Sequence, residues 1–243
     1  MSEKRDIATR MAGNQKQASI SEFFEKNKHF LGFDSLHRSL ITAVKEAVDN
    51  ALDACEEARI LPDIKIGIRK ADPKRDVIEL EVEDNGPGIP RDSIAKVFGQ
   101  LLFGSRFHAI RQSRGQQGIG ITGVVMYSQL TTGKPTHVRS KIASETTAVE
   151  MELGLDTKSN KAIKSKEQRV PWVREDGTEK VSGLNVRCRM KAKFQRGKQS
   201  VWQYLRMTSI VNPHASITFV DPDGETTHWP RVTERLPRKV SAI

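Results

Sequence analysis

Two groups of polar residues in the first half of the chain combine a carboxylate, a carboxamide and a glycine turn. Glu46, Asn50 and Asp53 follow one another at steps of four and three residues, so on a helix their side chains lie along one face. Further along, Asp84 begins a tight turn that contains Gly86 and Gly88. An acid, an amide oxygen and flexible backbone together predict a pocket for a nucleotide and its metal ion.

The helix that carries the first group is predicted from about Ser35 to Ile60. Its apolar residues recur at three- and four-residue steps and form one stripe: Leu40, Ile41, Val44, Val48, Leu52 and Cys55. For the opposite face of this helix, the alternative is an ordinary solvated polar surface without a function. Asp49, Asn50 and Asp53 favour a functional interpretation, because Asp and Asn each cost roughly half a kcal/mol in a helix relative to Ala. Their oxygens are therefore predicted to be needed there.

A pair of strands is predicted before the glycine turn, because apolar residues alternate with polar or small ones. The apolar positions are Ile64, Ile66 and Ile68, then Ile78, Leu80 and Val82. The second strand runs into Asp84, and Gly86 and Gly88 permit positive φ and a close approach of backbone. An ordinary loop after an edge strand is the alternative.

A glycine-rich segment, 104–123, precedes a helix predicted at Val124–Leu130. The start of a helix leaves unpaired amides at the positive end of the helix dipole, and such amides bind phosphate oxygens. The segment lacks the Gly-Lys-Ser/Thr of a P-loop. A mobile surface loop is the alternative, but the order of the three elements favours a phosphate site.

In this order the helix, the turn and the glycine-rich segment resemble the GHKL ATPases. Within that group, KEAVDNALDA (45–54), EDNGPGIP (83–90) and QSRGQQGIG (112–120) are most similar to the B subunit of the type IIB DNA topoisomerases, topoisomerase VI. Segment 20–33 also fits, and the resemblance covers residues 18–235. It implies an α/β (α+β) fold, a two-layer sandwich of helices on a mixed β-sheet called the Bergerat or GHKL ATP-binding fold.

The resemblance also implies a role for each motif residue. Glu46 would be the general base for the water that attacks the γ-phosphate of ATP, and Asn50 would ligate Mg²⁺. Asp84 would accept the adenine amino group, and Gly88 would pass close to the base. A lid would wrap the phosphates, formed by Ser105, Arg106, Arg114, Gly115, Gln116, Gln117, Gly118, Ile119, Gly120 and Ile121.

Two departures from the family pattern predict weak hydrolysis. Family members complete the phosphate site with a lysine from a transducer domain, and the sequence offers no candidate for it. A helix-two-turns-helix module is also absent from the sequence. The second departure is Leu184, which stands where a threonine is usual and is expected to weaken one hydrogen bond on the adenine side. An ATPase domain, either a fragment or a minimal homologue, is therefore expected.

The remaining chain is predicted to be mixed α and β. Strands are expected at 136–140, 147–153 and 217–220, a helix at 200–210, and a charged loop or hairpin at 157–178. The predicted organisation is a disordered basic tail (1–18), an N-terminal strap (19–34), the GHKL ATP-binding domain (35–235) and a C-terminal tail (236–243). Cys55 and Cys188 are predicted to be small core residues.

The sequence contains no secretory signal and no apolar run of the ~20 residues that span a membrane. A cytoplasmic, nucleoid-associated protein is therefore expected. The net charge of +10 concentrates in 158–198, where Arg187, Arg189, Lys191 and Lys193 alternate with apolar residues. This basic strand predicts contact with the backbone of double-stranded DNA, and a solvated sheet face is the alternative.

Three classes of function stay open. The first is the ATP-gated module of a type IIB topoisomerase, which changes DNA topology, dimerises when ATP binds and has a topoisomerase A subunit as a candidate partner. The second is a MutL-like DNA repair ATPase, which would share the pocket but not the RGQQGIG lid. The third is a non-catalytic DNA-binding or scaffold protein that retains the fold. A histidine kinase is disfavoured, because no phosphoacceptor helix precedes the domain.

Overall fold

The computed structural model describes residues 20–99, 120–156, 161–174 and 176–238. The helices of these residues are α2 (Ile20–Asn27), α3 (Leu36–Glu57), α4 (Arg91–Gly99), α5 (Gly120–Thr132) and α6 (Val201–Val211). The strands are β1 (Asp63–Asp72), β2 (Val77–Asp84), β3 (Thr136–Lys141), β4 (Ala148–Asp156), β5 (Lys161–Val170), β6 (Gly183–Lys191), β7 (Ser216–Val220) and β8 (Thr226–Trp229).

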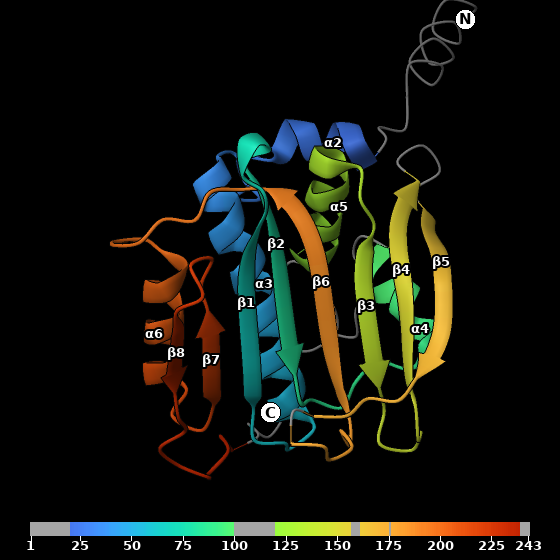
Figure 1. Ribbon diagram of the computed structural model, residues 1–243, viewed down its shortest axis with the longest axis vertical. Helices are drawn as coiled ribbons and strands as arrows, with labels where there is room; N and C mark the ends of the chain where they lie inside the picture. The colour runs from blue at the N-terminus through green and yellow to red at the C-terminus, as the bar shows by residue number, and fades with distance from the viewer. Residues whose placement is uncertain (1–19, 100–119, 157–160, 175, 239–243) are drawn as a thin grey trace, which may run out of the picture.

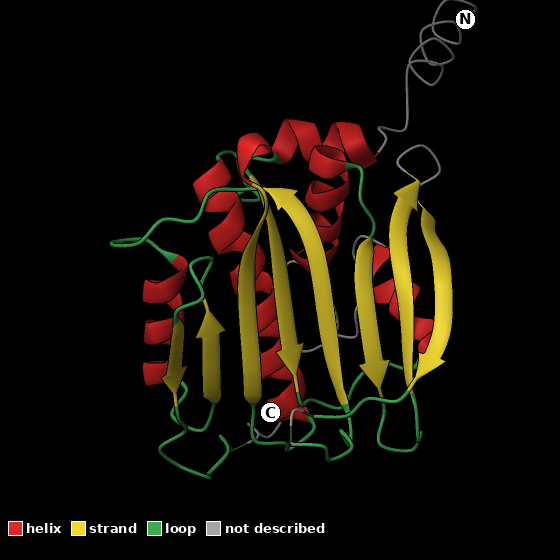
Figure 2. Ribbon diagram, viewed as in Figure 1, coloured by secondary structure: helices red, strands yellow, loops and turns green. Residues whose placement is uncertain are grey.

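The strands form one eight-stranded sheet in the order β5-β4-β3-β6-β2-β1-β7-β8. Every neighbouring pair is antiparallel except β1 and β7, which run parallel. The helices lie on one face of this sheet, and no helix of the described residues covers the other face (Figure 1 and Figure 2). The prediction of helices layered on a mixed sheet is confirmed.

Helix α3 lies over β1 and β2, between α5 and α6 (Figure 1). It begins where the Ser35 side chain accepts a hydrogen bond from the Arg38 amide at 3.2 Å. Its predicted apolar stripe faces the sheet and is fully buried, apart from the half-buried Ile41. Burial of each large aliphatic side chain stabilises the fold by roughly 1.5–3 kcal/mol, so the position of α3 on the sheet is firmly fixed.

Helix α5 is buried on nearly all sides, from Thr122 through Ser128. It packs on β6 and against α3 and α4. A helix of this kind needs apolar residues all round, which its sequence GITGVVMYSQLTT provides. It begins at Gly120, earlier than the predicted Val124, so the last glycines of the glycine-rich segment belong to the helix itself.

Of the charged loop or hairpin predicted at 157–178, the structure bears out the hairpin and adds a long strand. Lys161–Val170 is an edge strand that pairs with β4, and α4 packs on one side of it. Its many charged residues hide the strand pattern, yet charges are common on edge strands because they discourage pairing with other chains. The following residues do form a hairpin, joined by a bridge between Val173 and Glu179. Helix α4 and strand β8 were not predicted from the sequence.

The predicted tail at 1–18 and the last residues of the C-terminal tail lie outside the described residues. Among the described helices, none is both long and apolar enough to cross a membrane. Cys55 and Cys188 are both buried and free, as predicted for small core residues.

Candidate functional site

The carboxylate of Glu46 lies directly against the start of α5. A Cβ added to Gly120, the first residue of that helix, would come within 1.8 Å of Glu46 Oε2. Burial raises the pKa of Glu46, an effect that nearby Lys45 opposes and nearby Asp49 reinforces. Among the described residues, no side chain forms a hydrogen bond or ion pair with this carboxylate. A half-buried carboxyl group whose pKa is raised from its ordinary value toward neutral pH is suited to act as a base.

Asp49, on the same helix, has a structural role. Its two oxygens accept hydrogen bonds from the Tyr204 hydroxyl at 2.9 Å and from Lys45 Nζ at 3.0 Å. The prediction that side-chain oxygens are needed in the middle of this helix therefore holds for Asp49. Its oxygens, however, serve to attach α6 to α3. Asn50 differs, because it is half-buried and its side chain bonds to no described residue.

Asp84 ends β2 and is buried, with 6% of its surface exposed. Its Oδ1 accepts a hydrogen bond from the Gly86 amide at 2.8 Å. Burial raises the pKa of Asp84 to about 6, although the Gly86 amide, Lys180 and the Leu184 backbone act in the opposite direction. Asp84 therefore carries its charge at neutral pH but loses it in mild acid.

The turn after Asp84 is clamped to its neighbours. The Asn85 side chain accepts from the Asp63 amide at 2.8 Å and donates to the Leu61 carbonyl at 3.0 Å. Gly88 has φ +73°, and a Cβ there would lie 2.1 Å from the Lys141 carbonyl oxygen. The predicted need for glycine at 88 is confirmed, because both the left-handed backbone and the close approach exclude a side chain.

The same turn rests on the last turns of α3. A Cβ at Gly86 would lie 3.3 Å from Cys55 Sγ and 3.8 Å from Ala54 Cβ. The backbone of Gly86 does not use the positive φ that glycine permits, whereas the close approach expected at this position is confirmed. Helix α3 thus touches both parts of the candidate site, the start of α5 at Glu46 and the Asp84 turn at Ala54 and Cys55.

Most of the predicted lid lies outside the described residues. This applies to Ser105 and Arg106 and to every lid residue from Arg114 to Ile119. Only Gly120 and Ile121 are placed, in the first turn of α5. The structure therefore brings together Glu46, Asn50 and the start of α5 on one side and Asp84 with Gly88 on the other.

Two functional candidates beside Asp84 had no prediction. Gly183, at the start of β6, has φ +150°, and a Cβ there would lie 2.3 Å from the Asp84 carbonyl oxygen. Lys180 is buried, with its ammonium 2.5 Å from Glu83 and 4.4 Å from the centre of the Trp172 ring. The register also places Leu184 directly opposite Asp84. In the sequence, Ser182 and Gly183 stand directly before an alternating strand, and this pair could have indicated a tight turn beside Asp84.

The predicted basic strand is β6, and its charged side chains face an acidic neighbour. In the register, Arg187 stands opposite Glu81 and Arg189 opposite Glu79 on β2. Arg189 Nε lies 2.8 Å from Glu79 Oε2. The strand taken alone is strongly basic, but the sheet turns this surface into one of mixed charge.

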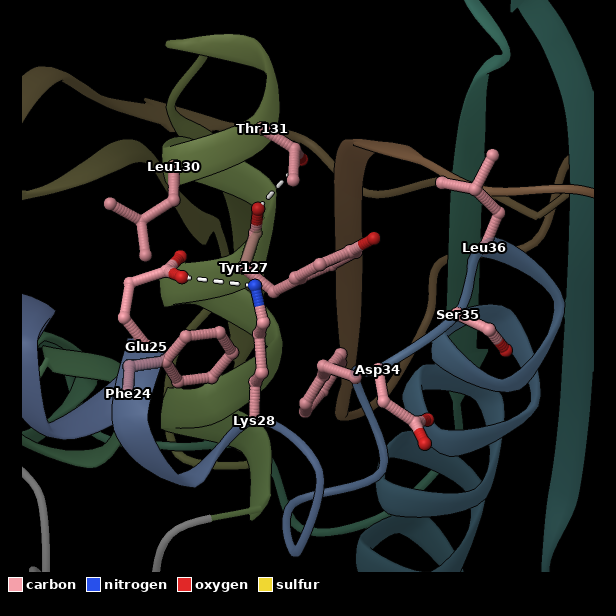
Figure 3. A pocket seen from close by; sticks show the side chains of 10 residues that line it. Phe24, Glu25, Lys28, Asp34, Ser35, Leu36, Tyr127, Leu130 and Thr131 are labelled. Carbon is pink, nitrogen blue, oxygen red and sulfur yellow. Dashed lines mark hydrogen bonds and ion pairs between the residues drawn. The ribbon is translucent and has the colours of Figure 1, made fainter.

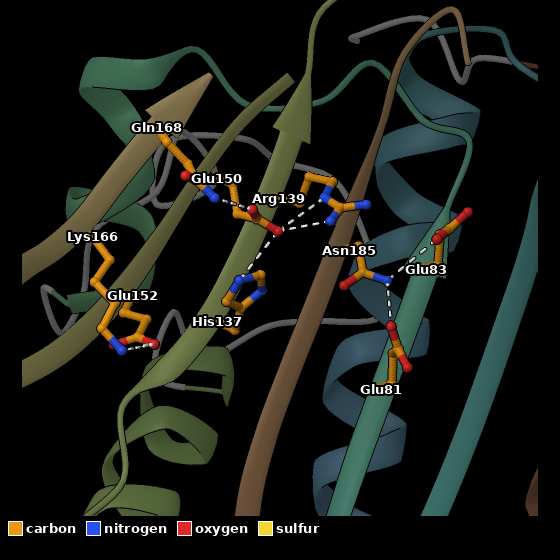
Figure 4. Close-up of polar contacts among 9 residues, drawn as sticks. All are labelled: Glu81, Glu83, His137, Arg139, Glu150, Glu152, Lys166, Gln168 and Asn185. Atoms are coloured by element: carbon orange, nitrogen blue, oxygen red, sulfur yellow. Dashed lines mark hydrogen bonds and ion pairs between the residues drawn. The ribbon is translucent and has the colours of Figure 1, made fainter. Parts of the chain in front are cut away.

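The other polar residues of this open sheet face are also largely paired. Lys193 lies 3.6 Å from Asp76, while Lys191 is exposed. Figure 4 shows Asn185 donating to Glu81 at 3.0 Å and to Glu83 at 3.2 Å. A second group, also in Figure 4, surrounds Glu150 and consists of Arg139, His137 and Gln168.

A separate cavity of about 350 Å³ lies near the other end of α5 (Figure 3). Its walls come from α2, from the segment that leads into α3, and from the later turns of α5. Phe24, Phe33 and Tyr127 stack within it, with ring centres 4.9 to 6.3 Å apart. These rings attach the segment predicted as a strap to the body of the domain.

Among the described residues, no three His, Cys, Asp or Glu side chains gather as a metal centre would require. Mg²⁺ usually takes one or two protein oxygens and completes its shell with phosphates and water. The amide oxygen of Asn50 is an oxygen donor of the kind Mg²⁺ accepts, and no side chain in the described part of the chain bonds to it. The site therefore fits Mg²⁺ that arrives with a phosphate group.

Comparisons with known proteins agree with this geometry. Residues 36–157 match the family model described as histidine kinase-, DNA gyrase B-, and HSP90-like ATPase. The chain is 53% identical over 236 residues to the B subunit of type 2 DNA topoisomerase 6 from Archaeoglobus fulgidus, covering 96% of the chain and 37% of that protein. It is 51% identical over 239 residues to the corresponding subunit of Halobacterium salinarum, covering 98% of the chain and 29% of that protein.

The chain thus spans about a third of the length of these curated relatives. Among solved structures, the ATPase and transducer domains of DNA topoisomerase II from Balamuthia mandrillaris superpose with a TM-score of 0.52. The identity is 15%, and the match covers 79% of this chain and 48% of that one. At this identity the likeness shows the fold alone, and it confirms the predicted arrangement of helices on a mixed sheet.

Proposed function

The chain belongs to the histidine kinase-, DNA gyrase B- and HSP90-like ATPase family, and from this premise we propose that it binds and hydrolyses ATP as the gate module of a type IIB DNA topoisomerase. The topoisomerase part of the proposal rests on identities near 50% to the B subunit of type 2 DNA topoisomerase 6 over almost the whole chain.

One observation carries the ATP proposal. Helix α3 touches the start of α5 at Glu46 and the Asp84 turn at Ala54. Glu46 and Ala54 are eight positions apart, which corresponds to about 12 Å of helix, a separation that an extended nucleoside triphosphate can span. In this proposal, Glu46 lies at the phosphate end of the nucleotide and the buried carboxylate of Asp84 lies at the base end.

At the base end, Asp84 accepts a hydrogen bond from the adenine amino group. Its charge at neutral pH and its fixed position, bonded to Gly86, suit an acceptor. Gly88 passes beside the base, because its backbone already lies too close to Lys141 for any side chain. This end supplies selectivity for adenine.

At the phosphate end, the amides at the start of α5 and the lid bind the phosphate oxygens. The lid comprises Ser105, Arg106 and residues 114–121. Asn50 would hold Mg²⁺, and the bound ion would neutralise part of the charge on the phosphates. Glu46 orients and polarises the attacking water, since no described side chain competes for its oxygens.

Binding and hydrolysis are tested together with Glu46→Gln. We expect hydrolysis to fall by about 10²–10⁴-fold, the usual contribution of a general base, while a non-hydrolysable ATP analogue with Mg²⁺ still binds. Glu57→Gln, at the exposed end of the same helix, is the matched control. Absence of analogue binding to the unmodified chain at millimolar ligand would refute the proposal, and loss of binding in Glu46→Gln would make Glu46 structural.

In the whole topoisomerase, this module dimerises when ATP binds and works with an A subunit on DNA. Residues 19–34 act as the strap of the dimer and residues 35–235 as its ATP-binding domain. Light scattering with and without the ATP analogue tests dimerisation, and a molar mass that stays that of one chain at saturating analogue contradicts it.

Double-stranded DNA is bound through phosphate contacts on β6 and just after it. Lys191 is the strongest candidate because it is exposed, whereas Arg187, Arg189 and Lys193 face acidic partners. Removal of one phosphate contact lowers the slope of log affinity against log salt by about 0.9. Lys191→Ala should show this change, and Arg189→Ala should show less.

A further inference from the structure

A buried lysine stands beside the base end of the site. Lys180 precedes β6 and is 5% exposed. Its ammonium contacts Glu83 Oε1 at 2.5 Å and lies 4.4 Å from the centre of the Trp172 ring. Buried charges need partners of this kind, because an unpaired ammonium inside a protein is strongly unfavourable. The ion pair with Glu83 and the face of the Trp172 ring together give the buried ammonium of Lys180 its partners.

Lys180 is also in contact with the corner that holds Asp84. A Cβ at Gly183 would lie 2.7 Å from Lys180 Cε, 3.2 Å from Lys180 Nζ and 2.3 Å from the Asp84 carbonyl oxygen. One glycine thus touches both residues. Any larger residue at 183 would push the lysine and the end of β2 apart.

Several groups act on the Asp84 carboxylate from the surrounding elements. From α3 comes the Cys55 thiol, whose pKa burial raises and which therefore stays neutral. From β2 comes Glu83, and from the segment before β6 comes Lys180. Among the described residues, three groups lower the pKa of Asp84: the backbone amides of Gly86 and Leu184, and the ammonium of Lys180. Of these three, only Lys180 is a cation.

We propose that Lys180 is a specificity-determining residue for the nucleotide base and acts through Asp84. Its buried ammonium keeps the Asp84 carboxylate ionised at neutral pH, so that Asp84 accepts hydrogen bonds and donates none. This inference rests on the proposed function, in which Asp84 faces the base.

The chemical consequence is discrimination between amino and carbonyl purines. An ionised carboxylate accepts from the amino group of adenine and repels the carbonyl oxygen at the same position of hypoxanthine. A protonated carboxyl group carries an O–H donor, which pairs with that carbonyl. Loss of the charge on Asp84 therefore weakens ATP binding and improves inosine triphosphate binding.

Glu83 and Lys180 shift the pKa of Asp84 in opposite directions, so the direction of the shift in each variant tests the proposal. Glu83 raises the pKa of Asp84, whereas Lys180 lowers it. Lys180→Met removes the cation and leaves the Glu83 charge, so the pKa of Asp84 should rise from about 6. Glu83→Gln leaves Lys180 without its anion, so the pKa of Asp84 should fall. A purely structural role of the ion pair would move both variants in the same direction.

The first measurement is a carboxyl-carbon NMR titration of Asp84 in the full chain and in both variants. Lys141→Met is the matched control, because Lys141 is also buried but pairs with Glu179 at 3.8 Å and is not among the groups that shift the pKa of Asp84 most. Opposite shifts of the Asp84 pKa in the two variants, with none in the control, support the proposal. An unchanged pKa in Lys180→Met, or shifts of one sign in both variants, overturns it.

The second measurement compares binding of non-hydrolysable ATP and inosine triphosphate analogues at neutral pH. Lys180→Met should lower the preference for ATP by at least about 2-fold, the change expected when a pKa moves from 6 toward 7. Lys180→Arg retains the charge and should retain the preference. An unchanged preference in Lys180→Met overturns the assignment. If the unmodified chain binds neither analogue, the proposed function fails, and the titration alone still decides whether Lys180 controls Asp84.

Discussion

The hydroxyl of Tyr204 donates a hydrogen bond to the Asp49 carboxylate at 2.9 Å, and this bond joins α6 to the helix that carries Glu46 and Asn50. The other oxygen of Asp49 accepts from Lys45, so the buried carboxylate is satisfied on both sides. Helix α6 is thereby attached to α3 within one helical turn of the candidate base.

Replacement of Tyr204 by phenylalanine tests this attachment. A hydrogen bond to a charged group contributes about 1.5–3 kcal/mol, so we expect Tyr204→Phe to lower the free energy of unfolding by that amount in urea denaturation. Tyr127→Phe is the control, because its hydroxyl donates to the neutral Lys191 carbonyl at 2.8 Å and should lose only about 0.5–1.5 kcal/mol. Equal losses would mean that the Asp49 charge does not strengthen the bond.

Nucleotide binding should depend on pH through Asp84. Its pKa in the folded protein is raised to about 6 from an ordinary value of 3.8. The ionised form accepts from adenine, so affinity for an ATP analogue should fall as pH is lowered through about 6. Isothermal titration between pH 5 and 8 measures this fall. Asp84→Asn should bind weakly and lack this dependence, and a wild-type affinity that is flat across the window contradicts the role.

The same group affects stability with the opposite sign. A raised pKa means that the folded state holds the proton more tightly than the unfolded state. The contribution of Asp84 to stability is therefore fully present below its unfolded pKa of 3.8 and is lost as pH rises through about 6. Asp84→Asn should consequently gain stability relative to the wild type at pH 8 more than at pH 5.

Gly120→Ala tests the contact between α5 and Glu46. The new Cβ would lie 1.8 Å from Glu46 Oε2, so the carboxylate must move. Displacement of a catalytic group by about 1 Å can reduce turnover by about 10²-fold, and we expect a loss of this size in ATP hydrolysis.

Gly123→Ala is the matched control in the same helix. Its Cβ would meet Phe33 Cε2 at 3.6 Å, an ordinary contact. Alanine also favours helix over glycine by about 1 kcal/mol, so this variant should keep its activity. Similar hydrolysis rates in the two variants would show that Glu46 is not the base.

Gly88→Ala tests the close approach of the Asp84 turn to β3. An alanine at φ +73° is strained by about 1–2 kcal/mol, and its Cβ would also lie 2.1 Å from the backbone oxygen of Lys141. Gly224 has φ +87° with open space around it, so Gly224→Ala carries the strain without the collision. Urea denaturation should show a clearly larger loss at position 88, and losses of equal size would mean that the turn can move away from β3.

Local patterns were sufficient to predict the central part of the fold. The stripe from Leu40 to Cys55 and the alternation in β1 and β2 report on burial directly, because each side chain faces the core at the period of its own element. The same reasoning placed Asp84 at the end of a strand and Gly88 in a close turn. The roles of Glu46 and Asn50 stay predictions that binding and kinetics must test.

Other features depend on contacts that no local pattern reports. Tyr204 and Asp49 are 155 residues apart, and the partner of a mid-helix carboxylate cannot be read from the helix itself. Lys180 is buried although lysine is rarely so, and its partner Glu83 belongs to β2, 97 residues earlier in the chain. The prediction of a basic surface from β6 alone was also incomplete, because the charge of a sheet face depends on the neighbouring strand as well.

The parallel pairing of β1 with β7 has a consequence for synthesis of the chain. Residues Asp63–Gly67 pair with Ser216–Val220, so α3 emerges from the ribosome long before the strand and helix that complete its surroundings. At about 5–20 residues per second, the 155 residues between Asp49 and Tyr204 take roughly 8–30 s to translate. During that time, the helix that carries Glu46 and Asn50 lacks the hydrogen bond that Tyr204 donates to Asp49. The nascent domain therefore reaches its final packing only after α6 and β7 have been made.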